Sequence, residues 1–477
     1  MPKNRTEPGS ASRRRFLTTF ALGASAAPLL SLSRGLFAGP GTTLAGSDPA
    51  SLCYSNKRVL GPADLRYLGV MRVPSQNVDM AFSYGTMTGR KVNGVVHLLM
   101  LGNITKGDPL YELADTGQYS PDVSQAPRMA LVRSWGRIFG SARRSWQPDG
   151  TAKDIFFDPG ALLWNEATQL LYWTFYDTYN VRGDEDWCLG ASRLQDSGPV
   201  AFGPWRPSGG GRKGPWRCVR LGQHPSGDLL CGSFVMSGNA SSPWGPDLWT
   251  GQFPIASTPS GFGAPDLPIQ KYVTYYGMFG NINRDGTFEG PLRAFRRPGD
   301  YFFEPILGEG ILTEIDPQKN NGVGSWTQLD GIGSPTWIDL PDVHGVLFAG
   351  RLAAAHVWYR NAGVGNLLCT HGQASPIDVT GPVSTDAYPV FIIYDPADLN
   401  AVRAGQRVDY TVEPSSTVNA QTAFGMKTAP ITMMGSAKAL GGSYFDAETR
   451  TLYVAAPQAD ATIPGLFNPL VHVFRVT

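Results

Sequence analysis

Hydrophobic positions along the chain recur as pairs of short apolar segments separated by a few polar residues. In the clearest pair, residues 161–164 and 170–176 are apolar and aromatic, whereas residues 165–169 between them are mostly polar. These polar residues are types that form tight turns through local side-chain hydrogen bonds or unusual backbone angles. The same layout returns at residues 224–231, 341–348 and 443–455. Because long helical periodicities are absent, the pattern predicts an all-β chain of short antiparallel hairpins.

The second segment of each hairpin carries a leucine that marks the interval between units. Successive leucines are separated by 72, 59, 117 and 105 residues, and they are Leu99, Leu171, Leu230, Leu347 and Leu452. The two longer intervals are close to twice the shorter ones, and fainter copies of the pattern at residues 283–295 and 390–394 fill them. Seven units of about 61 residues result, somewhat longer than the roughly 40–50 residues of common propeller repeats.

Radial repetition of small antiparallel sheets protects the edges of each sheet and buries both of its faces. The sequence therefore predicts a single-domain β-propeller of about seven blades, within a range of six to eight, over residues 46–477. A stacked pair of β-sandwiches is the alternative. The last segment, residues 471–476, alternates in polarity. We expect it to close the ring against an early strand and to bring the two ends of the domain together.

A basic segment precedes the predicted propeller. Residues 12–17 read Ser-Arg-Arg-Arg-Phe-Leu, and a mildly apolar stretch follows at residues 20–32. The segment resembles the twin-arginine signal family, whose pattern is Ser-Arg-Arg-any-Phe-Leu, with Arg13 and Arg14 as the paired arginines. A membrane anchor shares this layout. The apolar stretch contains Gly, Ser and Pro, however, and it is marginal for spanning roughly 30 Å of hydrocarbon.

This resemblance implies that the Tat translocase exports an already folded protein and that the mature chain is periplasmic or extracellular. We expect residues 1–45 to be the signal peptide and a short spacer, with cleavage between about residues 35 and 50 and no stable membrane span afterwards. The whole chain has a net charge of +1. Removal of the basic signal leaves a slightly acidic protein, which makes nucleic acid a poor partner. We expect a monomer.

The strongest chemical signal begins at Asp158. Residues 158–164 read Asp-Pro-Gly-Ala-Leu-Leu-Trp, and residues 171–177 form an aromatic segment that ends in Asp177. The layout resembles the blade pattern of furanosidase-type glycoside hydrolases, five-bladed propellers in which an Asp at the inner end of a first-blade strand acts as a base. The resemblance makes Asp158 the candidate base, with Asp177 and Glu304 as partners. Glycoside hydrolysis requires two carboxyl groups roughly 5–9.5 Å apart. Alternatively, Asp158 starts a structural turn.

Aromatic and basic residues supply candidate substrate contacts. Sugar rings stack on the faces of Trp and Tyr, and Arg matches carboxylate groups in a bidentate geometry. The candidates for these roles are Trp187, Trp216, Arg217, Arg351 and Trp358. For each tryptophan the alternative is packing between sheets, and for each arginine it is a solvated strand end.

The sequence demands no cofactor, although two groups of residues could bind a metal. His344, His356 and His371 fall within 28 residues and could hold a transition metal or act as acid and base. The acidic residues 184–186 could bind Ca²⁺. Chance scatter and a solvated loop are the respective alternatives. Cys218 and Cys231 flank a turn and are expected either to form a disulfide or to remain buried thiols.

Three functions remain open. The leading hypothesis is an exported enzyme that acts on extracellular carbohydrate, as a hydrolase or, on a uronic substrate, as a lyase. The first alternative is a propeller without catalysis that binds a glycan or a protein. The second is a metal-dependent enzyme that uses the three histidines. A propeller fold supports many chemistries, so the choice depends on the residues at its site.

Overall fold

The computed structural model describes residues 57–140, 145–146, 150, 152–153, 158–176, 187–208, 220–232, 248–273, 306–307, 311–312, 331–360, 381–407, 412–429, 439–462 and 467–477. The predicted export signal, with Arg13 and Arg14, lies outside these residues. So do the candidates Asp177, Trp216, Arg217, Glu304 and His371, the acidic residues 184–186, and Cys218.

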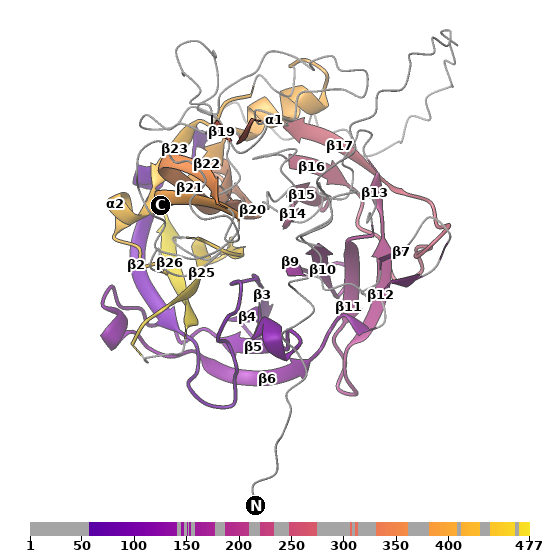
Figure 1. Cartoon of the computed structure of the whole chain (residues 1–477), viewed down its shortest axis with the longest axis horizontal. Helices are drawn as coiled ribbons and strands as arrows, with labels where there is room; N and C mark the ends of the chain where they lie inside the picture. The colour runs from indigo at the N-terminus through magenta and orange to yellow at the C-terminus, as the bar shows by residue number, and fades with distance from the viewer. Residues whose placement is uncertain are drawn as a thin grey trace, which may run out of the picture. The chain divides into compact units, whose positions relative to one another are not determined.

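Five antiparallel sheets are arranged around a common axis (Figure 1), which confirms the all-β propeller. The first blade contains β3 (Met87–Val92), β4 (Val95–Leu101), β5 (Leu110–Ala114) and β6 (Ala130–Gly136). The second contains β9 (Asp158–Asn165), β10 (Leu170–Tyr176), β11 (Leu189–Arg193) and β12 (Val200–Trp205). The third contains β14 (Arg220–Gln223), β15 (Leu229–Gly232), β16 (Leu248–Gly251) and β17 (Leu267–Val273), with β13 (Pro207–Ser208) paired in parallel to β17.

The fourth blade contains β20 (Gly331–Asp339), β21 (Val343–Arg360), β22 (Gly381–Tyr394) and β23 (Ser416–Asn419), with β1 (Arg58–Val59) paired in parallel to β21. The fifth contains β24 (Ser443–Asp446), β25 (Thr451–Asp460), β26 (Asn468–Val476) and β2 (Leu65–Arg72). Two small ribbons and two short helices complete the described α and β elements: β7 (Ser145–Trp146), β8 (Ala152–Lys153), β18 (Ile306–Leu307), β19 (Ile311–Leu312), α1 (Pro396–Arg403) and α2 (Ala420–Phe424).

The expected seven blades are wrong, because the described residues form five large sheets. The five marker leucines are correct: each lies in the second strand of a different blade and is at most 1% exposed. The error arose in the two long intervals. Residues 390–394 belong to β22, the third strand of the fourth blade, and residues 283–295 lie outside the described residues. Between Leu347 and Leu452, the long strands β21 and β22 therefore account for the doubled interval without an additional blade.

The predicted ring closure is confirmed. β26, near the C-terminus, pairs antiparallel with β2, so the fifth blade combines strands from both ends of the domain. The backbone N–H of Thr477 donates to the carbonyl oxygen of Asp64 at 3.0 Å, just before β2 begins. The preceding β1 pairs with β21 of the fourth blade. Residues 58–72 thereby connect two neighbouring blades.

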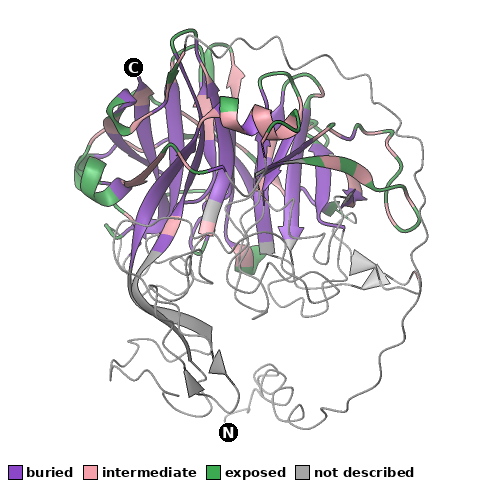
Figure 2. Ribbon diagram, turned by 90° about the horizontal axis from the view of Figure 1, so that it is seen from above, coloured by how far each residue is buried: buried purple, intermediate pink, exposed green. Residues whose placement is uncertain are grey.

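The core lies between adjacent sheets. Apolar side chains of each blade pack against the facing side chains of the next, and most of the described strands are buried along their length (Figure 2). Cys231 of β15 is a buried free thiol in one of these layers, so the alternative of a disulfide with Cys218 is wrong. Among the described residues, no helix is both long and apolar enough to cross a membrane.

Glycines allow the innermost strands to approach one another closely. A Cβ atom at Gly441, just before β24, would lie 2.5 Å from the carbonyl oxygen of Gly85. A Cβ atom at Gly333 of β20 would in turn overlap the carbonyl oxygen of Gly441. The N–H of Gly442 donates to the carbonyl oxygen of Gly85 at 2.8 Å. The fourth, fifth and first blades therefore meet backbone to backbone near the axis.

Candidate functional site

The innermost strands β3, β9, β14, β20 and β24 define two faces of the propeller, and we call the face at which they begin the start face. At the opposite face, short turns such as residues 93–94, 166–169 and 224–228 join these strands to the second strands. On the start-face side, the chain runs 15 residues from the end of β15 to the beginning of β16 and 20 residues from the end of β21 to the beginning of β22. Long connections on a rigid scaffold commonly carry binding and catalytic residues. The start face is therefore the candidate functional face.

Asp158 is the first residue of β9, the innermost strand of the second blade. Its Cα partner on β10 is Tyr176, the residue that precedes Asp177 in the sequence. Two residues further along β9, the carbonyl oxygen of Gly160 accepts a hydrogen bond from Nη1 of Arg220. Arg220 is itself the first residue of β14. The backbone thus brings a carboxylate residue and an arginine to the starting ends of two adjacent inner strands.

Two other inner strands contain a carboxylate residue, Asp339 in β20 and Asp446 in β24. Both residues lie at the opposite end of their strands from Asp158. Asp339 ends β20 and pairs with Nζ of Lys57 at 2.5 Å, while Asp446 ends β24 and lies 3.3 Å from Nζ of Lys91. β3 and β14 contain no Asp or Glu. A second carboxyl group beside Asp158 would therefore have to come from another strand or from a connection of the start face.

The furanosidase-type pattern agrees with this arrangement in one respect and differs in another. The large described sheets number five, which equals the number of blades in that family. The residue that the pattern identifies lies in the second blade, however, and the corresponding strand of the first blade reads Met-Thr-Gly-Arg-Lys-Val. The catalytic role of Asp158 consequently stays a prediction.

Two of the predicted substrate contacts have described side chains, and they lie in different blades. Trp187 is only 8% exposed, with the guanidinium of Arg206 4.8 Å from its ring centroid. This packing favours the structural alternative for Trp187. Arg351 is half-buried in β21, where its Cα partners are Gly331 and Pro389. Trp358 lies near the end of the same strand.

The predicted histidine metal site stays a prediction, because His371 and the side chain of His356 lie outside the described residues. His344 and His356 both belong to β21 and are twelve residues apart. An extended strand rises about 3.3 Å per residue, which separates the two by roughly 40 Å. His344 is 2% exposed, with Nε2 3.5 Å from Oδ1 of Asp395, and burial lowers its pKa. Within the described part of the chain, no group of three or more His, Cys, Asp or Glu residues could hold a metal ion.

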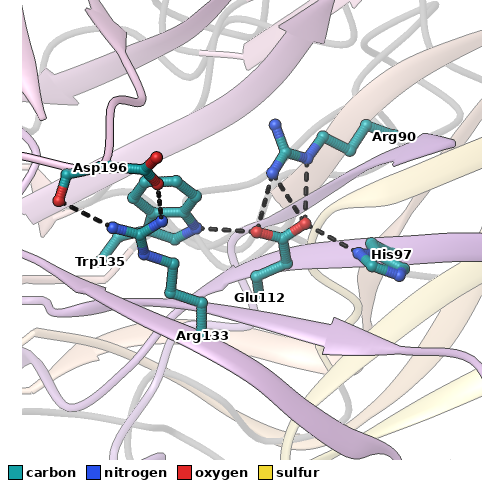
Figure 3. Close-up of polar contacts among 6 residues, drawn as sticks. All are labelled: Arg90, His97, Glu112, Arg133, Trp135 and Asp196. Carbon is teal, nitrogen blue, oxygen red and sulfur yellow. Dashed lines mark hydrogen bonds and ion pairs between the residues drawn. The ribbon is translucent and has the colours of Figure 1, made fainter. Parts of the chain in front are cut away.

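The first blade contains a polar network that the sequence analysis did not predict (Figure 3). Glu112 of β5 is 2% exposed, and its Oε1 accepts hydrogen bonds from Nε and Nη2 of Arg90 at 3.0 and 2.8 Å. Nδ1 of His97 also lies 2.8 Å from Oε1, and Nε1 of Trp135 donates to Oε2 at 2.9 Å. Each of the four strands of the first blade thus contributes one residue.

The same network reaches the second blade. The Arg90 guanidinium lies 4.9 Å from the ring centroid of Trp164 in β9. At the periphery, Nη1 of Arg133 pairs with Oδ1 of Asp196 at 2.6 Å, and its guanidinium stacks on Trp135 at 4.0 Å. Buried charges are stable only when paired and hydrogen-bonded. The network therefore fastens the first two blades together.

Electrostatics argue against a catalytic acid role for Glu112. Burial alone would raise the pKa of its carboxyl group, but the hydrogen bonds from His97, Arg90 and Trp135 outweigh burial and lower it. A general acid at neutral pH needs a pKa near the working pH. Glu112 is instead ionised and enclosed by donors.

A second buried polar group lies between the third and fourth blades. His224 is 1% exposed, and its Nδ1 accepts a hydrogen bond from the backbone N–H of Ser226 at 3.0 Å. The proton of the neutral ring is therefore on Nε2, and the ring lies edge-on to Trp337, with centroids 4.2 Å apart. Burial lowers the pKa of His224 to about 4. The side chain is neutral at pH 7 and packs as part of the core.

No protein-family model matches the sequence, and no curated protein sequence matches it. Among solved structures, similar chains include a proposed glycoside hydrolase from Bacteroides ovatus, with 8% identity, a TM-score of 0.36, and coverage of 88% of this chain and 95% of that chain. An α-L-arabinanase from Cellvibrio cellulosa has 11% identity and a TM-score of 0.34, with 83% and 92% coverage. A member of the DUF4221 family from Bacteroides vulgatus has 8% identity and a TM-score of 0.34, with 87% and 98% coverage.

Proposed function

We propose that the protein is an exported enzyme that acts on extracellular carbohydrate at the start face of its propeller, with Asp158 as the acid–base residue. The observation that carries this proposal is the position of Asp158, the only carboxylate residue that begins one of the five described inner strands. Inner strands meet near the axis, so their first residues face the same region of the start face. Loops of that face could supply a second carboxyl group and the substrate contacts.

Arg220 supports the same assignment. Its guanidinium is fixed to the carbonyl oxygen of Gly160, which stabilises the geometry at the beginning of β9. The resemblance to furanosidase-type hydrolases implies the role of a base for Asp158.

The test is a hydrolysis panel of arabinan, xylan, β-glucan and polygalacturonate, with product formation by elimination followed separately on the uronic polymer. We expect Asp158→Asn to lower turnover by at least about two orders of magnitude, the usual effect of losing an acid–base group, and to leave folding intact. Asp342→Asn is the matched control, because Asp342 is 46% exposed in a turn of the opposite face. A chelator added to the wild-type reaction tests for a metal.

A structural role of Asp158 would give a different result. Loss of a turn-forming side chain lowers stability by about 1 kcal/mol and leaves activity per folded molecule unchanged. That outcome would contradict the proposal.

One observation favours a non-catalytic, glycan-binding propeller as a second candidate. Hydrolysis requires two carboxyl groups, and the described inner strands bring only Asp158 to the start face. Such a protein would bind one of the four polysaccharides without degrading it, and Asp158→Asn would then leave its binding unchanged.

A further inference from the structure

The connection that leads from β2 into β3 contains a tight turn with an unusual residue at its third position. The N–H of Ser83 donates to the carbonyl oxygen of Met80 at 3.1 Å, which closes a four-residue turn. Phe82 occupies the third position with φ of 59°. Gly or Asn normally occupies a turn position with positive φ, because a Cβ atom crowds the backbone there. A left-handed conformation costs an ordinary side chain roughly 1 kcal/mol or more.

The Phe82 ring is exposed although the turn around it is buried. Phe82 is 42% exposed, whereas Met80, Ala81 and Ser83 are 1%, 8% and 0% exposed. Oγ of Ser83 donates to the carbonyl oxygen of Leu101 at 2.7 Å, so the turn is anchored to the first blade. The left-handed backbone lowers the stability of the fold, and the exposed part of the ring adds no buried area. Features of this kind concentrate at functional sites.

The turn lies at the start face, where the first and fifth blades meet. Gly85, three residues after Phe82, accepts the hydrogen bond from Gly442 at the beginning of β24. A Cβ atom at Gly85 would lie 3.2 Å from Pro457, and the next residue, Gln458, also has a positive φ, of 54°. Five other described non-glycine residues have a positive φ. Three of them are Asn or Asp, which tolerate a positive φ, and the other two, Gln169 and Arg450, belong to hairpin turns of the opposite face.

A second aromatic ring supports Phe82 from the fifth blade. Phe467, immediately before β26, has its ring centroid 6.0 Å from that of Phe82, with an interplanar angle of 60°. At this angle the two rings do not stack face to face. Phe467 therefore holds the Phe82 ring in place and leaves part of its surface open to solvent.

We propose that Phe82 is a substrate-binding residue whose ring stacks on the apolar C–H face of a sugar unit of the bound carbohydrate. The inference rests on the proposed function, and it adds a specific contact at the junction of the first and fifth blades. A phenyl ring offers no hydrogen-bonding group, so its contribution is selective for an apolar face. The rigid, buried turn fixes the ring before the ligand binds, which reduces the entropy lost on binding.

The test measures binding separately from turnover. Each variant is made in the Asp158→Asn background, and affinity is measured by electrophoresis in gels that contain the polysaccharide of the panel that the wild-type protein degrades. Phe82→Asn should weaken binding about tenfold, while Phe82→Tyr should retain it within about threefold. The thermal midpoint of Phe82→Asn should be equal to or higher than that of its parent, because Asn tolerates the left-handed backbone.

Phe262→Asn is the matched control, because Phe262 is 49% exposed in the connection between β16 and β17, and it should leave binding unchanged. Unchanged binding by Phe82→Asn would overturn the inference and leave the proposed function intact. A lowered thermal midpoint of Phe82→Asn with unchanged affinity would have the same consequence. If the wild-type protein neither degrades nor binds any of the four polysaccharides, the proposed function fails, and the inference fails with it.

Discussion

Tyr453 of the fifth blade donates a hydrogen bond from its hydroxyl group to Oδ2 of Asp115 in the first blade at 2.6 Å. The same carboxylate oxygen accepts a hydrogen bond from Tyr119 at 2.8 Å. Burial and the hydrogen bond to Asp115 raise the pKa of Tyr453, so its hydroxyl group is a donor at neutral pH. The junction that closes the ring is thus held by side chains as well as by the β2–β26 pairing.

Tyr453→Phe should destabilise the protein by about 2 kcal/mol, because a buried hydrogen bond to a charged acceptor is lost. Urea unfolding monitored by tryptophan fluorescence measures the change. Tyr119→Phe is the comparison, and we expect a smaller effect because Tyr119 is only partly buried. Equal stability of Tyr453→Phe and wild type would show that the hydroxyl group contributes nothing at this junction.

Glu112→Gln should cost about 3 kcal/mol, since it leaves the partly buried Arg90 without its charged partner. The carboxylate has a lowered pKa in the folded state, so its contribution is fully present above its ordinary value of 4.5 and is lost as the pH falls through the folded value. The stability of Glu112→Gln should therefore fall less than that of the wild type as the pH is lowered below 4.5. Glu448→Gln serves as a control, because Glu448 is 78% exposed in its pair with Lys91 and its loss should change stability by less than about 1 kcal/mol.

Two buried histidines predict a loss of stability in mild acid. Burial lowers the pKa of both His224 and His472 from 6.5 to about 4. The unfolded chain therefore binds protons below pH 6.5 that the folded protein does not bind until about pH 4, so stability is full above 6.5 and declines between these values. Each group could account for up to about 3 kcal/mol at the lower limit. Urea unfolding midpoints that stay constant from pH 7 to pH 4.5 would contradict this expectation.

Replacement of both Arg13 and Arg14 by Lys should leave the precursor in the cytoplasm, because the twin-arginine pattern requires both guanidinium groups. Arg15→Lys is the matched control, since Arg15 stands at the unrestricted position of that pattern. Cell fractionation locates the protein, and mass spectrometry of the exported form should give an N-terminus between about residues 35 and 50. Exported protein that retains residues 1–30 would rule out the cleaved signal.

The fold was predictable where it depends on local sequence. Hairpins of the opposite face are encoded by apolar segments on both sides of a few turn residues, and Leu171 and Leu452 marked the second strands correctly. The number of blades depends instead on how segments far apart in the chain pair. Residues 390–394 are as apolar as a new hairpin would be, yet they form the third strand of an existing blade.

The polar network of the first blade could not be recognised for the same reason. Arg90, His97, Glu112 and Trp135 come from four strands, and each alone is an ordinary polar or aromatic residue in a half-buried strand. Only the register of the sheet brings them together. The histidines illustrate the converse case, because His344 and His356 are close in sequence but lie twelve residues apart along one extended strand.

The pairing of β2 with β26 makes the fold sensitive to the completeness of the chain. A product that ends before Asn468 lacks β26, so β2 and β25 each keep an unpaired edge and the ring stays open. Open edges promote association with other chains. During synthesis, β2 therefore stays unpaired until β26 has left the ribosome. The architecture thereby distinguishes chains that contain β26 from chains that lack it.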